Sequence, residues 1–578
     1  MKIKKPHITS SNKAIILIAL FSVLFVLAVR WNGLSGNNFR NIIQSDGIGY
    51  YHYFEALLGE NPIGKQSENG IFLIKAEDNK VVNKYFVGTA LLMSPFVMPV
   101  YLVEKSLGVE IDLRSEYYQK SISIAALFYL LLGLWAIAKL LIIFKIDEHI
   151  IAFGLFALFF GTNLSYYTLI EPSMSHVYSF SLISVFFLVF KQQLGEYKSV
   201  RLIMLSALFA LIVLIRPINI LVVFALPFVS SSVKVFYDLI LRKTKAFPIN
   251  IIAVFVFILI ASVQLIFWKL QTGNWIIWSY SNEGFYFLKP HLIDFLFSFR
   301  KGLFIYTPFL FLGLIVFVLA YRKHKQELFL SLGFLLLVLY VLSSWWNWYY
   351  GDSYGSRVMI DYYAIFILLF AMGIQKLRIK LQRVIVIIAS LFVMLNVFQS
   401  YQYYHNIMSH FDMNASKYAY IFGKAGEKYE NSLGGNDDIV RFHREPLELV
   451  YHKQYDSTMA TTVDVDAKMG LYHRINAFEL GGGDNYYLEL SNSVLLERGN
   501  MDKVYWVIIY TDSLNKNYNY EKIKFNEIPL LEGEVEMNNY RLNLPGFMSK
   551  KDKMHLFIRN ESNAKFIVLN LEIRVYTI

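Results

Sequence analysis

Residues 14–29 read AIILIALFSVLFVLAV, an uncharged run that ends at Arg30-Trp31-Asn32. About 20 predominantly apolar residues are needed to cross a bilayer as a helix, and 14–30 approaches that length. The basic stretch Met1–Lys5 precedes the run, and no small-residue cleavage site follows it. The sequence therefore predicts an uncleaved first transmembrane helix.

The composition agrees with a membrane protein. Hydrophobic residues make up 56% and charged residues 17% of the chain, and the mean hydropathy is +0.41. A soluble domain carries about 25% charged residues. The net charge of +11 comes mainly from short basic loops between apolar runs, which is the pattern of cytoplasmic loops, so we expect no nucleic-acid partner. Because the chain has no cysteine, disulfides, thiolate metal sites and cysteine nucleophiles are excluded.

Further apolar runs predict a polytopic α-helical membrane protein with about eleven spans. The expected spans lie at 14–30, 119–144, 149–168, 176–191, 200–215, 218–233, 249–270, 302–320, 327–344, 357–374 and 382–400.

One more apolar segment, 85–105, determines the topology. Counting it as a span would place the basic loops on different sides of the membrane, and leaving it out places them all on the cytoplasmic side. Pro95 and Pro99 also disfavour a straight spanning helix. We therefore expect an interfacial or re-entrant helix in the first external loop, 31–118, and an external C-terminal segment.

Hydrophobicity falls after about residue 400, and short strand-like runs separated by polar turns appear. They lie at 487–490, 504–510, 553–558 and 566–576. The sequence thus predicts a transmembrane catalytic domain (1–400), a juxtamembrane connector (401–440) and an extracytoplasmic β-sandwich (441–578).

An acidic, tyrosine-rich segment follows the first span and reads SDGIGYYHYFE over 45–55. A carboxylate at the bilayer surface is costly and is commonly functional. Asp46 could sit in a turn as a general base for an acceptor hydroxyl, followed by a short amphipathic helix over 50–59. Asp46 could equally be the N-cap residue of that helix.

This layout resembles the GT-C superfamily of polyprenyl-phosphate-sugar-dependent transferases, especially the protein O-mannosyltransferase and lipid A aminoarabinose transferase branch. Their first external loop carries an acidic, aromatic and Glu pattern, matched here by Asp46, Tyr50 and Glu55. Asn83-Lys84-Tyr85 is similar to their Lys-Pro motif, although the proline is absent here. Their second external acid is matched by Glu171.

The resemblance implies an inverting glycosyltransferase of the cytoplasmic membrane, with its site on the outer (periplasmic) face. The expected partners are a polyprenyl-phosphate-linked sugar, membrane lipids, and a protein, lipid or glycan acceptor. Asp46 and Glu171 would then be the catalytic pair, with Glu171 orienting the acceptor or holding a divalent metal such as Mg²⁺ or Mn²⁺. A non-catalytic polyprenyl-lipid transporter or an envelope glycan assembly protein is the alternative. Charges at span ends and the lack of a detectable repeat favour the enzyme.

Four cations are candidates for the donor phosphate. They are Lys84, Arg216, Arg300 and Arg357. Three of them, Lys84, Arg216 and Arg300, have a simpler explanation as residues that contact lipid headgroups or extend to the interface, and Arg216 could also pair with Glu171.

Further side chains are candidates for substrate binding, because aromatic faces stack on sugar rings and polar groups bind hydroxyls. They are Tyr50, Glu55, His176, Trp346 and Asp352. An interfacial aromatic belt alone would also explain the tryptophans around Trp346, and helix packing would explain His176. No nucleotide-binding or HExxH motif is present in the sequence.

Overall fold

The structure, a computed structural model, describes most of the chain. The described residues are 9–32, 41–59, 64, 72–76, 80–244, 247–281, 283–411, 413–426, 429, 448–456, 458, 460–467, 469–481, 485–501, 504–525 and 532–577.

The chain divides into two compact units. The first, here called the helical unit, comprises Met1–Ser281, Leu303–Leu339 and Gly355–Ser400. The second, here called the β unit, comprises Asn282–Gly302, Tyr340–Tyr354 and Tyr401–Ile578. Two loops from between the predicted spans thus group with the C-terminal segment.

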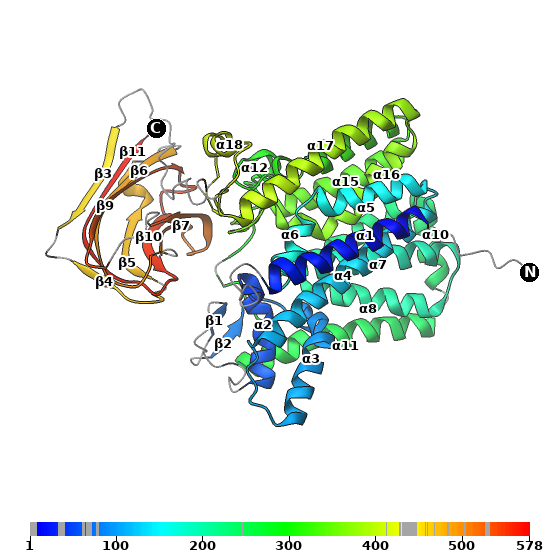
Figure 1. The fold of residues 1–578 in the computed structure, drawn as a ribbon, viewed down its shortest axis with the longest axis horizontal. Helices are drawn as coiled ribbons and strands as arrows, with labels where there is room; N and C mark the ends of the chain where they lie inside the picture. Colours follow the sequence, from blue (N-terminus) through cyan, green and yellow to red (C-terminus); the bar gives the residue numbers. More distant parts are fainter. Residues whose placement is uncertain are drawn as a thin grey trace, which may run out of the picture. The chain divides into compact units, whose positions relative to one another are not determined.

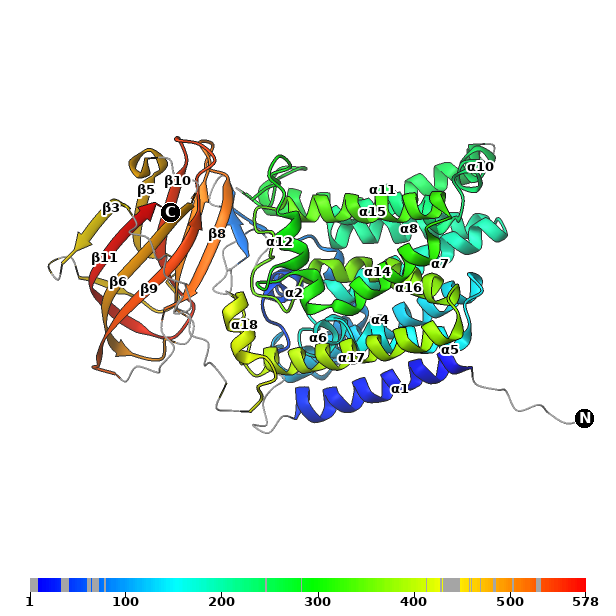
Figure 2. The same ribbon diagram turned by 90° about the horizontal axis from the view of Figure 1, so that it is seen from above.

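The helical unit is built from apolar helices. Several of them, such as α1, α11 and α17, run from side to side across the unit in both views (Figures 1 and 2). Its long helices are α1 (Ser10–Phe25, continued by the π-helix Val26–Trp31), α3 (Gly88–Leu107), α4 (Glu116–Ile143), α7 (His176–Gly195), α8 (Ser199–Ile215), α11 (Phe247–Thr272), α15 (Lys325–Ser343) and α17 (Ile379–Tyr404).

Shorter helices complete the helical unit. They are α2 (Asp46–Leu58), α5 (Glu148–Phe160), α6 (Leu164–Leu169), α9 (Leu226–Val229), α10 (Val233–Thr244), α13 (Leu303–Tyr306), α14 (Pro308–Tyr321), α16 (Tyr363–Gln375) and the 3₁₀ helices η4 (Pro217–Ala225) and η5 (Arg357–Tyr362). The strands β1 (Leu73–Lys75) and β2 (Val81–Asn83) form an antiparallel hairpin.

Every predicted span coincides with helical structure. Among the described residues, eight helices are long and apolar enough to cross a membrane, and four shorter apolar helices accompany them. The protein is therefore a polytopic α-helical membrane protein, and the number of its crossings stays a prediction.

Helix α3 is one of the eight, although its segment is predicted to lie at the membrane surface. It remains helical through Pro95 and Pro99, and Figure 1 shows it steeply inclined to α11. That inclination agrees with a surface helix, but length and composition also permit a crossing.

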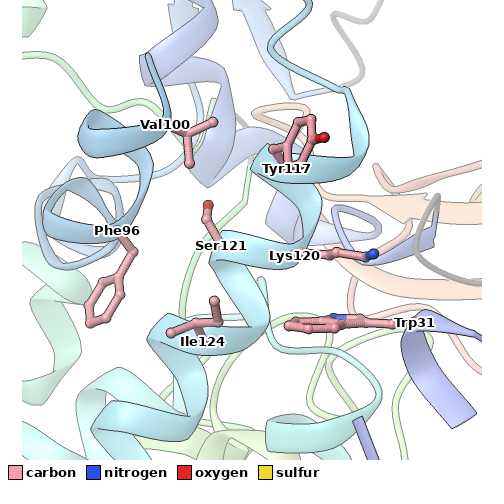
Figure 3. A pocket seen from close by; sticks show the side chains of 7 residues that line it. All are labelled: Trp31, Phe96, Val100, Tyr117, Lys120, Ser121 and Ile124. Atoms are coloured by element: carbon pink, nitrogen blue, oxygen red, sulfur yellow. The ribbon is translucent and has the colours of Figure 1, made fainter. Parts of the chain in front are cut away.

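A cavity of about 300 Å³ opens between the π-helical end of α1, α3 and α4 (Figure 3). Its walls are largely apolar, and Lys120 lies over the Trp31 ring, 5.2 Å from the centroid. The candidate residues named in the sequence analysis do not line it.

The β unit contains the predicted antiparallel sandwich. One sheet has the order β5 (Gly470–Asn476), β10 (Lys553–Asn560), β7 (Val504–Thr511) and β8 (Asn517–Lys524). The other has the order β3 (Glu448–Tyr455), β11 (Lys565–Thr577), β6 (Asn485–Arg498) and β9 (Val535–Pro545), with β4 (Thr461–Val463) also paired to β11. Figure 2 shows strands of both sheets. All four strand-like runs of the sequence lie in β6, β7, β10 and β11, so these strand predictions are confirmed.

The core between the two sheets is dense, because alternate residues of facing strands point inward. Trp506, Leu488 and Ile573 are completely buried in it. The outer side of the β7–β10 sheet is apolar too: Tyr505, Val507 and Phe557 form a second buried cluster against Phe411.

The first loop of the β unit, Asn282–Gly302, carries α12 (Leu292–Phe297), and α18 (Ala415–Ile421) follows α17. Arg300 in the first loop forms an ion pair with Glu521 of β8 at 2.8 Å. Tyr349 in the second loop donates a hydrogen bond to the Tyr520 carbonyl. The loops and strands therefore pack as one unit.

Candidate active site

Asp46 is the first residue of α2, and Ser45 before it has a positive φ of 51°. The Asp46 Oδ2 atom lies 2.8 Å from Nη2 of Arg357, and the two side chains are 23% and 10% exposed. A hydrogen bond links the carboxylate to Tyr85. The expectations of a turn at Asp46 and of an N-cap role are therefore wrong, since Asp46 lies inside the helix and Ser45 occupies the cap position.

The surroundings of Asp46 favour its ionised form. Burial alone would raise the pKa of the carboxyl, but the charge of Arg357, the hydrogen bond to Tyr85 and the charges of Lys84 and His176 together hold the pKa below its ordinary value of 3.8. The group is thus a carboxylate at neutral pH.

The glycines of the SDGIGYY segment let α2 approach its neighbours. A Cβ on Gly47 would lie 2.0 Å from the Ser173 Oγ, and a Cβ on Gly49 would lie 2.4 Å from the Tyr85 ring. Both glycines are buried within α2. Asp46 is therefore held against the 171–175 turn and against Tyr85 by close packing.

The predicted amphipathic helix is instead buried along most of its length. Tyr51 donates to the Leu113 carbonyl and Tyr53 to the Tyr85 carbonyl, each at 2.7 Å. A buried hydroxyl needs a hydrogen-bond partner, and both tyrosines find theirs in backbone carbonyls. These tyrosines therefore have a structural role.

Tyr50 lies beside Asp46 in the same cluster. Its hydroxyl is 3.1 Å from the Ser175 Oγ, and its ring centroid is 4.7 Å from that of Tyr85. Burial and the nearby Asp46 charge raise the pKa of Tyr50 to about 12. Tyr50 is therefore a neutral hydrogen-bonding group that limits the space next to the carboxylate.

Lys84 follows the β1–β2 hairpin and contributes a positive charge to the Asp46 environment. Its Nζ lies 5.5 Å from the centroid of the Tyr280 ring, and its carbonyl accepts a hydrogen bond from Ser279 at 2.9 Å. The hairpin and the chain around Ser279 thus fix the backbone of this lysine.

Glu171 is 7% exposed and precedes the N-terminus of α7. Glu171 does not cap α7, because Ser175 is the N-cap residue of that helix. Instead Glu171 acts electrostatically on Arg357. Arg357 therefore interacts with two acidic groups, Asp46 by contact and Glu171 electrostatically.

Arg216 and His176 meet at a carboxylate that was not among the sequence candidates, Asp361 of η5. Arg216 Nη1 is 3.3 Å from Asp361 Oδ2, and His176 Nδ1 is 3.2 Å from Oδ1. The expected partners of Arg216 were a phosphate or Glu171. Asp361 could have been found from the sequence, because it is an acidic residue within the apolar run 357–374. A carboxylate in a predicted span is a functional-site candidate by default.

Glu55 does not join Asp46. Nine residues of α-helix turn the chain by about 900°, so the two carboxylates leave opposite sides of α2. Glu55 pairs with Arg114 at 2.6 Å and His52 at 3.2 Å. Burial opposes ionisation, but these partners hold the pKa of Glu55 below its ordinary value.

Three candidates belong to the β unit: Arg300, Trp346 and Asp352. The Arg300 guanidinium lies over the Tyr349 ring, 3.6 Å from the centroid, and Trp346 is buried in an edge contact with Tyr520. Asp352 is exposed. The contacts of Arg300 and Trp346 are those of packing between loops and strands.

The expected divalent metal stays a prediction for the described residues. Among them, no group of three His, Asp or Glu side chains converges as a metal site would need. Asp46 and His176 already have Arg357 and Asp361 as partners.

Comparison with known proteins finds similarity among solved structures alone. No family model and no curated protein matches the chain. Among solved structures, an arabinosyltransferase is similar to it. The cryo-EM structure of EmbB from Mycobacterium smegmatis aligns with a TM-score of 0.45 and 6% identity, over 96% of this chain and 64% of that chain. The protein thus spans 64% of the length of that chain. Similarity at this level of identity and TM-score does not assign an activity to the protein.

Proposed function

We propose that the protein is a membrane glycosyltransferase of the GT-C type. It transfers a sugar from a polyprenyl-phosphate donor to a hydroxyl acceptor, with inversion, at the outer face of the cytoplasmic membrane. The observation that supports the proposal most is the ionised Asp46, placed 2.8 Å from Arg357 and within the field of Lys84.

The chemistry needs one base and several cations. The acceptor oxygen attacks the anomeric carbon while Asp46 takes the hydroxyl proton, and the bond from that carbon to the phosphate oxygen breaks. The products are the glycosylated acceptor and the polyprenyl phosphate. A positioned base contributes about 10²- to 10⁴-fold in rate.

The surrounding side chains have separate roles in this proposal. Arg357 keeps Asp46 ionised, and Glu171 orients the acceptor. Lys84 and Arg216 neutralise the donor phosphate as the leaving group departs, which is the form of catalysis that fixed charges supply.

Asp46→Asn tests the role of the base. The amide preserves the shape of the side chain but cannot take a proton, so we expect transfer to fall by roughly 10² or more. The measurement is mass spectrometry of polyprenyl-phosphate sugars and envelope glycans in cells that carry the variant. The donor should accumulate and its product should disappear.

Glu55→Gln is the matched control, because it changes a carboxylate on the opposite side of the same helix. It should cost stability through the Arg114 pair and leave turnover of the folded protein intact. Normal glycans with Asp46→Asn would instead support the transporter or assembly role.

A further inference from the structure

Asp361 is completely buried, yet it carries a carboxylate within an apolar part of the chain. It lies in η5 and contacts side chains from two other elements, α7 and the α8–η4 junction. Burying a carboxylate costs several kcal/mol unless hydrogen bonds and opposite charge compensate. Its contacts therefore show what this carboxylate holds in place.

Side chains from both elements meet the carboxylate. His176 approaches Oδ1 at 3.2 Å, while Arg216 and Asn219 donate to Oδ2 at 3.3 and 2.8 Å. Asn219 is itself fixed, because its Nδ2 also donates to the Ser179 Oγ at 2.6 Å and its Oδ1 accepts from Tyr362 at 3.1 Å. The network is thus rigid around Asp361.

The members of this network differ in exposure. The side chains of Asp361 and His176 are 0% and 4% exposed, whereas that of Arg216 is 16% exposed. His176 is too enclosed to exchange a proton with a substrate. The Arg216 charge also acts on Tyr50, which lies beside Asp46. The guanidinium therefore links the buried carboxylate to the candidate active site.

We propose that Asp361 is a positioning residue that holds the Arg216 guanidinium where the phosphate of the polyprenyl-phosphate donor binds. A guanidinium carries five N–H donors in a planar fork, so one arginine can meet a carboxylate on one side and a phosphate on another. This inference rests on the proposed function, and it adds a residue that does not touch the substrate.

The effect of such positioning on donor binding can be measured. A free arginine samples many rotamers, and one held in place gives up less entropy when phosphate binds. Misplacing a binding group by about 1 Å can cost about 10²-fold. Loss of the Asp361 charge should therefore weaken donor binding by roughly 10- to 100-fold.

The test compares Asp361→Asn, Arg216→Lys and the control Ser179→Ala. The control removes a buried hydroxyl from the same network without a contact to Arg216. We expect Asp361→Asn and Arg216→Lys to raise the donor KM and leave the acceptor KM unchanged. We expect Ser179→Ala to lower thermal stability and change neither KM. Because KM does not depend on the folded fraction, partial misfolding does not imitate this result.

A double variant and a binding measurement complete the test. Asp361→Asn combined with Arg216→Ala should bind donor no worse than Arg216→Ala alone, since Asp361 acts through Arg216. Binding of undecaprenyl phosphate, measured by native mass spectrometry, needs no turnover. An unchanged donor KM in Asp361→Asn would overturn the inference and leave the transferase intact. Absence of transfer by the wild type, together with weaker undecaprenyl phosphate binding by Asp361→Asn, would overturn the transferase and support the inference.

Discussion

The acid–base state of Asp46 depends on one arginine more than on any other neighbour. Burial pushes the pKa of the carboxyl upward, and Arg357 is the first of the groups that push it down. The net direction is downward, so the carboxylate contributes stability above its unfolded pKa of about 3.9. That contribution is lost as the pH falls through the folded pKa.

Arg357→Gln should therefore change the pH dependence of transfer. In the wild type we expect kcat/KM to be flat from about pH 8 down to about pH 5, because a base whose pKa is held below 3.8 stays ionised there. In the variant the pKa of Asp46 rises, and an acid limb should enter this range. The matched control is Arg300→Gln, which removes an arginine from the β unit. A flat profile in Arg357→Gln would show that Arg357 does not keep the base ionised.

The position of α2 depends on Gly47 and Gly49, which let the helix approach its neighbours closely. In an exposed helix, alanine is favoured over glycine by about 1 kcal/mol. At Gly47 the added Cβ would meet the Ser173 side chain at 2.0 Å. Overpacking of this kind costs about 1–3 kcal/mol, so the usual gain should be reversed.

Gly47→Ala should thus lower the thermal unfolding temperature and the transfer rate together, because it pushes Asp46 away from the 171–175 turn. Adding Ser173→Gly should restore part of both by removing the atoms that clash. Gly333→Ala in α15 is the control, since a Cβ there meets nothing within 4 Å. It should leave stability unchanged or slightly higher. A stabilising Gly47→Ala would contradict the close approach.

Helix α3 decides the topology at the scale of elements. If it lies on the outer surface, as the basic loops predict, then reporters fused after Lys245, Lys325 and Ile578 should read inside, inside and outside. A reporter in the loop after Gly108 should read outside, like one after Gly59. An inside reading at Ile578 would mean that α3 crosses the membrane.

At the scale of the molecule, the β unit joins C-terminal strands to loops that connect the transmembrane helices. The second loop ends at Tyr354, and the next residues of the chain lead directly to Arg357. Tyr349 and Trp346 of this loop pack on β8 within the β unit.

The segment from about Phe442 to Ile578, expressed alone, should still unfold cooperatively, because all the buried residues of the core between the sheets come from this segment and only the partly buried Tyr286 is added by a loop. It should also bind a hydrophobic dye, since removal of Phe411 and the loops uncovers Tyr505, Val507 and Phe557. Replacing Val507 with Lys should reduce dye binding without lowering the core stability. A non-cooperative transition would show that the loops are part of the folding unit.

Some features followed from the sequence because they depend on local pattern. Apolar runs such as 119–144 became helices, and 504–510 became a strand, since length and periodicity are properties of a short segment. The charges at Asp46, Lys84 and Arg216 stood out because apolar neighbours make an isolated charge costly wherever the chain folds.

Only the tertiary structure decided which charges meet. Asp46 contacts Arg357 and Arg216 contacts Asp361 because η5 packs among α2, α7 and η4, and no local pattern specifies such packing. The same holds for Glu55, which points away from Asp46 because α2 is one continuous helix. It also holds for Arg300, which pairs with Glu521 in a strand far along the chain. Local hydropathy determines what each segment becomes, whereas the partners of a buried charge are set by the close fit of segments distant in sequence.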